Sequence, residues 1–92
     1  MDSNIQHTER GFARVEFNDS SWASCSLQDS SAVEDKIWLG MDFSPEGEQV
    51  GIINETLGYV ISSRMHLTRD QVAFLLPYLQ RFVDTGSIDD SL

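Results

Sequence analysis

The sequence predicts a small α+β domain, in which an antiparallel sheet of about four or five strands packs against a C-terminal helix. Two observations carry this prediction. Short stretches in the first two thirds of the chain alternate apolar and polar residues, as a strand with one buried face does. The final third instead spaces its apolar residues as a helix does, after a sequence typical of helix starts. With 92 residues, the chain has room for one domain only.

The first two predicted strands form a β-hairpin. Residues 13–17 and 23–27 alternate apolar and polar side chains, and the polar residues 18–21 between them are typical of a turn. On the second strand, the face directed away from the core carries Ser24, Ser26 and Gln28.

Two strands, and a third candidate that is ambiguous, are predicted between the hairpin and the helix. Residues 37–41 form the third strand, whereas residues 49–58 are ambiguous and fit a short edge strand followed by a loop. From Tyr59 to Leu67 the alternation predicts a fourth strand, whose polar face presents Ser62, Arg64 and His66.

The C-terminal helix has a recognisable beginning and end. Thr68 and Gln71 match a capping box, and Gly86 stands where a left-handed C-terminal cap is common. Pro77 has no backbone N–H to donate, so we expect the helix to be kinked or split there. The apolar residues expected to face the sheet are Val72, Leu75, Leu76, Leu79 and Val83.

The domain is expected to lie between two polar ends. Residues 1–10 are polar and aperiodic, which predicts a mobile N-terminal tail. The single α+β domain then covers residues 11–87, and residues 88–92 form an acidic C-terminal tail.

The composition points to a cytoplasmic protein without a membrane span. The apolar runs are far shorter than the roughly 20 residues that a spanning helix needs. Cys25 is the one cysteine, so no disulfide can form within the chain, and we expect it to be a buried apolar residue.

A strong negative charge argues against direct contact with nucleic acid. The net charge is -9, and such a field repels DNA and anionic membranes at long range. The acidic residues are concentrated in the middle of the chain, as either a solubilising face or a surface that imitates DNA phosphates. They are Asp29, Glu34, Asp35, Asp42, Glu46, Glu48 and Glu55.

The candidate site is a patch of hydrogen-bond donors on the polar faces of two predicted strands. Arg64 and His66 project from the same face with Ser62, and Ser26 and Gln28 from the hairpin can extend the patch. Guanidinium and hydroxyl groups suit a phosphate or a ribose. The alternative is an ordinary solvated sheet face with Arg64 paired to an acid. Trp22, Trp38 and Tyr59 could stack on a base, although aromatic residues in so small a chain are more often core.

Signatures of catalysis are lacking in the sequence. His7 and His66 offer too few ligands for a metal site, and the glycines follow no phosphate-binding or dinucleotide pattern. No residue sits in a nucleophile elbow. The sequence therefore predicts a binding protein without a cofactor, not an enzyme.

Two segments of the chain resemble a known family. One is Cys25-Ser26-Leu27-Gln28-x-Ser30-Ser31, followed by Glu34-Asp35-x-Ile37-Trp38-Leu39-Gly40. The other runs from Arg64-Met65-His66-Leu67-Thr68-Arg69-x-Gln71-Val72 through Leu75-Leu76-Pro77-x-Leu79 to Phe82 and Thr85-Gly86. Together they resemble small bacteriophage and prophage proteins, identified as the anti-Thoeris sponge family, which sequesters a cyclic ADP-ribose immune signal.

This resemblance implies a homo-oligomer, at least a dimer, that holds a small cyclic nucleotide near subunit interfaces in the cytoplasm of the infected bacterial host. In such a sponge Arg64 would meet a phosphate, while Gln28 and serine hydroxyls would meet ribose. The segment 42–58 is shorter than the corresponding insert of the family. The alternative function is an acidic inhibitor that imitates DNA and binds a bacterial defence protein.

Overall fold

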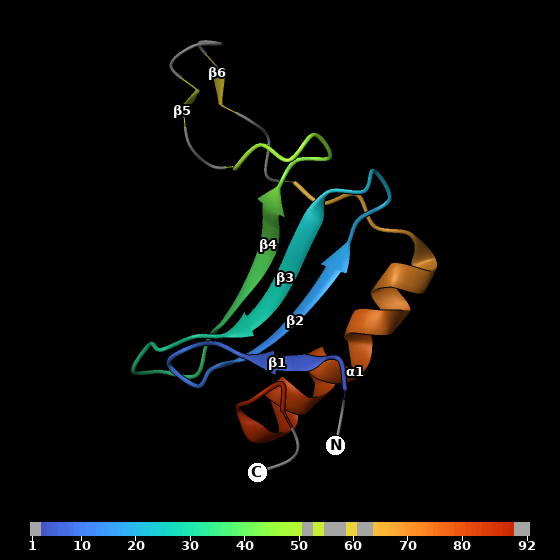
Figure 1. Ribbon diagram of the computed structural model, residues 1–92. Coiled ribbons are helices and arrows are strands. Elements are labelled where there is room, and N and C mark those ends of the chain that lie inside the picture. The colour runs from blue at the N-terminus through green and yellow to red at the C-terminus, as the bar shows by residue number, and fades with distance from the viewer. Residues whose placement is uncertain (1–2, 51–52, 55–58, 61–63, 90–92) are drawn as a thin grey trace.

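The chain folds as an α+β domain. A computed structural model describes residues 3–50, 53–54, 59–60 and 64–89. Four strands of the described part of the chain form one sheet, and Figure 1 shows the helix lying across one face of it. The elements are β1 (Ile5–His7), β2 (Ala13–Asn18), β3 (Ser24–Asp29), β4 (Ile37–Phe43), β5 (Ile53–Asn54), β6 (Tyr59–Val60) and α1 (Arg69–Thr85).

The sheet is antiparallel, with the strand order β1-β2-β3-β4. Val15 on β2 lies opposite Leu27 on β3, and Leu27 lies opposite Leu39 on β4, so these three side chains share one face. That face packs against α1 and forms the core. The buried core residues are Ala13, Val15, Leu27, Leu75, Tyr78 and Ile88.

The hairpin and the third strand predicted from the sequence are confirmed by β2, β3 and β4. The segment expected to be a polar tail is different, because it contains β1. Ile5 lies opposite Val15 and packs against the core, so pairing with β2 removes an apolar side chain of this segment from water. At the other end, Ile88 is fully buried and Asp89 is also buried, so the acidic tail begins inside the fold.

The fourth strand expected from Tyr59 to Leu67 is wrong for its C-terminal part. Among the described residues of this range, Tyr59–Val60 is a strand, and it pairs with β5 in a separate two-stranded sheet. Residues 64–68 form no strand, although the backbone of Thr68 is extended. A fifth strand in the main sheet is not shown. The backbone of His66 is held instead by Asp19 and Ser20 at the β2–β3 turn, which satisfies groups that a strand partner would otherwise pair.

The helix boundaries follow the capping residues. Thr68 accepts a hydrogen bond from the backbone of Gln71, and Gln71 in turn accepts one from the backbone of Thr68. Gly86 has a left-handed φ of 83°, and its N–H donates to the carbonyl of Phe82 over 2.8 Å. A kink or split at Pro77 is not shown, because α1 is one element on both sides of it. Pro77 lies on the exposed side of the helix, where water can solvate the carbonyl that lacks its partner.

The predicted phase of the helix is only partly right. The structure buries Leu75 and Tyr78, whereas Val72, Leu76 and Val83 are 48%, 59% and 77% exposed. The buried face of α1 is therefore rotated about the helix axis, away from the predicted stripe of valine and leucine residues and toward Tyr78. Tyr78 can occupy it because its hydroxyl accepts a hydrogen bond from Asn4, which lies just before β1.

No helix within these ranges combines the length and apolar character required of a membrane span.

Candidate ligand-binding surface

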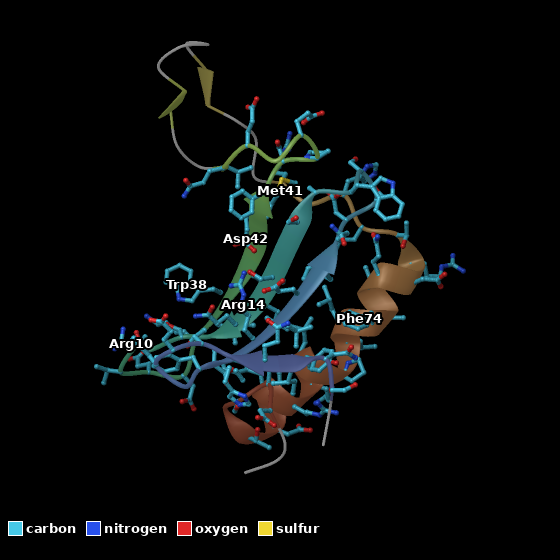
Figure 2. All side chains as sticks on the ribbon, viewed as in Figure 1. Arg10, Arg14, Trp38, Met41, Asp42 and Phe74 are labelled. Atoms are coloured by element: carbon cyan, nitrogen blue, oxygen red, sulfur yellow. The ribbon has the colours of Figure 1, made fainter. Side chains whose placement is uncertain are left out.

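The face of the sheet opposite α1 is polar and carries the residues best suited to bind a ligand. Gln28 on β3 lies directly between Arg14 on β2 and Trp38 on β4. Figure 2 shows Arg14 and Asp42 over the sheet, Trp38 beside β4 and Arg10 toward the lower end of the sheet. This surface therefore combines a guanidinium, an amide and an aromatic ring from three neighbouring strands.

Arg14 organises the middle of this surface. Its Nη1 donates to Oε1 of Gln28 over 3.1 Å, and its Nη2 donates to Oδ2 of Asp42 over 3.1 Å. Its Nε donates to Oε1 of Glu16 over 3.4 Å. The two carboxylates beside Arg14 offset its positive charge, so this guanidinium is poorly suited to bind a phosphate. It instead holds the neighbouring side chains in place.

A hollow of about 370 Å³ opens beside this network at the β1–β2 turn. Trp38 forms part of its wall, and the side chain of Trp38 is 68% exposed. The guanidinium of Arg10 lies 5.5 Å from the centre of the Phe12 ring, close to the same hollow. The residues that line it are Thr8, Glu9, Arg10, Phe12, Gln28, Ser31 and Trp38.

The chemistry of this hollow fits a nucleotide. An exposed indole can stack on a base, and a guanidinium can meet a phosphate. Gln28 lines the hollow, and because its Oε1 accepts from Arg14, the group that it can offer to a ligand oxygen is its amide NH₂ donor. Ser31 adds a hydroxyl, which can donate or accept.

The structure separates the two halves of the patch predicted from the sequence. Ser26 and Gln28 do lie on the polar face, although Ser26 is only 6% exposed. Arg64 and His66 belong to the segment 64–68, which runs past the β2–β3 turn, and Gln28 is near the other end of β3. From Ser24 at the turn to Gln28 the strand rises roughly 13 Å.

Two other predicted site residues cannot be placed in this surface. Ser62 lies outside the described residues. Tyr59 is in β6, away from the main sheet, and its side chain is also outside the description. Arg10 and Arg14 were not among the predicted site residues, and Trp38 was considered only as one of three aromatic residues that could stack on a base. Arg14 could have been found from the alternation of β2, which places it on the polar face that also carries Gln28.

Asp19 is a buried acid that ties the segment 64–68 to the β2–β3 turn. Its Oδ1 accepts from the backbone N–H groups of Ser21 and Ala23 over 2.9 and 3.0 Å, and its Oδ2 accepts from His66 over 3.1 Å. Burial alone raises the pKa of Asp19, but these hydrogen bonds to the charged form outweigh it and hold the pKa below 3.8. The charged carboxylate is therefore part of the fold.

Cys25 is 1% exposed, which agrees with the expected apolar role. Burial, with a contribution from the charge of Asp19, raises the pKa of Cys25 from 9.0 to about 11. We expect iodoacetamide at pH 8 to alkylate the folded protein at least roughly a hundredfold more slowly than an exposed thiol, as a two-unit pKa difference requires. Mass spectrometry of timed reactions measures the rate, and unfolding in guanidinium should abolish the protection.

In the parts of the chain that the structure describes, no group of three or more His, Cys, Asp or Glu residues is placed to hold a metal ion. His7 does lie near an acid, with its Nε2 3.1 Å from Oδ2 of Asp89. Two groups of this kind do not make a metal site.

Comparison with protein-family models, with curated proteins and with solved structures gives no match for this chain.

Proposed function

We propose that this chain is a bacteriophage binding protein that sequesters a cyclic ADP-ribose-type immune signal without catalysis, in the cytoplasm of the infected host. One observation supports the proposal most. Gln28 and Ser31 come from one half of the first resembling segment and Trp38 from the other half, and all three line the same hollow. The residues that suggested the family are thus adjacent on a surface with nucleotide-binding chemistry.

The proposed mechanism needs only affinity. Trp38 stacks on the adenine, Arg10 meets a phosphate, and Gln28 donates to a ribose or phosphate oxygen. Arg14 acts indirectly by holding the amide of Gln28. A protein that binds the signal tightly lowers its free concentration by mass action, so the proposal requires no acid, base or nucleophile.

The first test of this proposal is Trp38→Ala. Stacking of a base on an aromatic side chain is worth about 1–3 kcal/mol, so we expect roughly 5- to 150-fold weaker binding of the cyclic ADP-ribose isomer that the wild type prefers. The fold of one chain should be retained, because the ring is 68% exposed and lies outside the core. Isothermal titration calorimetry with each cyclic ADP-ribose isomer measures the affinity. Absence of binding by the wild type to every isomer would contradict the proposed function.

The location of the site is tested by a matched pair of arginine variants. A phosphate contact from Arg10 should be worth about 1.5–3 kcal/mol, so Arg10→Ala should weaken binding roughly 10- to 150-fold while Arg64→Ala leaves it unchanged. The opposite result would move the ligand to the segment 64–68. That outcome would keep the function but reject the hollow.

The alternative function, an acidic inhibitor that imitates DNA, receives less support from the positions of the acids. Asp42 is paired with Arg14 on the sheet. Asp29 accepts hydrogen bonds from the hydroxyl of Ser87 over 2.7 Å and from the backbone N–H of Ile88 over 3.1 Å. These two carboxylates hold the fold together and are poorly placed to act as free phosphate mimics.

A further inference from the structure

The two edges of the sheet differ in length and protection. β1 has three residues, and a strand this short offers little for another chain to pair with. β4 has seven residues and lies at the other edge. Its neighbour β3 is paired on both sides, so β4 is the one long edge strand of this sheet among the described residues.

The backbone groups of β4 that face outward can be identified from one hydrogen bond. The carbonyl of Lys36 accepts from the N–H of Ser30 over 3.0 Å, so the backbone of Lys36 faces β3. Because successive residues of an antiparallel strand point their N–H and C=O groups to opposite edges, Trp38 and Gly40 also face β3. The groups that face away from the sheet then belong to Ile37, Leu39 and Met41.

This open edge ends at Met41. Beyond it, the carbonyl of Asp42 accepts from the N–H of Val50 over 3.4 Å, and Phe43 forms a bridge with Gln49. Chain from the same molecule therefore covers that end of β4. The interval of β4 whose outer edge has no described strand partner is therefore 37–41, and its midpoint is Leu39.

The side chains on this interval are apolar and exposed. Trp38 is 68% exposed on the polar face of the sheet, and Leu39 is 41% exposed on the face that carries α1. Edge strands of monomeric proteins are commonly protected by a charged or proline residue in the strand. The interval 37–41 has neither of them.

We propose that this edge pairs with the same edge of a second copy of the chain, antiparallel about a two-fold axis at Leu39. Each copy would then donate the outward N–H groups of Ile37, Leu39 and Met41 to the other, and the two sheets would become one. Such an interface is isologous, as expected for a dimer. The inference rests on the sheet edge alone and not on the ligand proposed above.

The residues that meet in this register are complementary. Leu39 lies opposite Leu39 of the second copy, and Ile37 lies opposite its Met41, which buries apolar side chains on the face of α1. On the other face, Trp38 lies opposite Gly40, where a large ring has room to cover a residue without a side chain. The pairing ends at Met41, because Val50 of the same molecule already covers Asp42. In a register centred on Trp38, the two indoles would meet.

Position 39 provides a direct test because the axis places it opposite itself. We expect the wild type to have about twice the 10.4 kDa mass of one chain by light scattering at micromolar concentration. Leu39→Lys and Leu39→Glu should each reduce the mass to that of one chain, since like charges would then meet at the axis. Mixing the two variants should restore the double mass. Leu76→Lys, which places the same charge on an exposed position of α1, should remain dimeric.

A cross-linking experiment keeps the proposal testable if the charged variants fail to fold. Directly opposed residues in a hydrogen-bonded antiparallel pair have Cα atoms roughly 5.5 Å apart, which a disulfide can bridge. Leu39→Cys should therefore form a covalent dimer under mild oxidation, whereas Leu76→Cys should not. A monomeric wild type, dimers that persist in both charged variants, or equal cross-linking at the two positions would each overturn the proposal.

Discussion

Leu75→Ala is expected to lower the free energy of unfolding by about 2–5 kcal/mol, the usual cost of truncating a buried leucine. Leu75 is 3% exposed and belongs to the core cluster that joins α1 to β2 and β3. Its truncation removes apolar contacts and leaves a cavity that the rigid sheet beneath it cannot close. Chemical denaturation followed by circular dichroism measures the change.

The neighbouring leucine supplies the control for this prediction. Leu76 is 59% exposed, so Leu76→Ala should change the free energy of unfolding by less than about 0.5 kcal/mol. The two substitutions are chemically identical and differ only in which way the helix turns the side chain. Equal costs at the two positions would show that the helix packs on the sheet in another phase.

The parts of the fold that the sequence predicts well are those decided by local chemistry. The hairpin of β2 and β3 follows from a two-residue alternation on each side of a polar turn. The helix start follows from Thr68 and Gln71, whose side chains each satisfy the other's backbone N–H. Its end follows from Gly86, because a left-handed φ favours a residue without a side chain.

The errors have a common physical origin in tertiary contacts. The apolar residues of α1 cover more of its circumference than one sheet can bury, so periodicity alone could not separate Leu75 from Leu76. The choice depends on Tyr78, whose hydroxyl finds a partner in Asn4, far away in the sequence. In the same way, the alternation around Met65 and Leu67 could not reveal that the carboxylate of Asp19 would accept a hydrogen bond from the backbone N–H of His66.

The candidate site could be predicted only in part, for a related reason. The sequence identified Ser26 and Gln28 on the polar face, because strand parity is a local property. It assigned them Arg64 as a partner on the assumption that residues 59–67 form a strand of the same sheet. Without that strand, the guanidinium beside Gln28 is the one from β2, Arg14. Strand order is decided by long-range pairing, which a single sequence does not display.

Asp19→Asn should lower the free energy of unfolding at neutral pH by about 1.5–3 kcal/mol, the worth of hydrogen bonds to a buried charged group. An asparagine can keep the bonds that Oδ1 accepts from Ser21 and Ala23. At the position of Oδ2, however, its NH₂ group would face the N–H of His66, and two donors would then meet. The segment 64–68 would lose an attachment to the β2–β3 turn.

The pH dependence distinguishes the carboxylate from a merely polar side chain. The pKa of Asp19 is lower in the folded protein than its ordinary value of 3.8, so the unfolded chain binds the proton more readily. The stability that Asp19 contributes is therefore fully present above pH 3.8 and is lost as the pH falls through the folded pKa. The difference in free energy of unfolding between the wild type and Asp19→Asn should be constant between neutral and mildly acidic pH, and should shrink in more acidic solution.

Denaturation curves along a pH series, with Glu46→Gln in an exposed turn as the control, measure this difference. A gap between the wild type and Asp19→Asn that persists unchanged in strong acid would mean that the charge of Asp19 does not stabilise the fold.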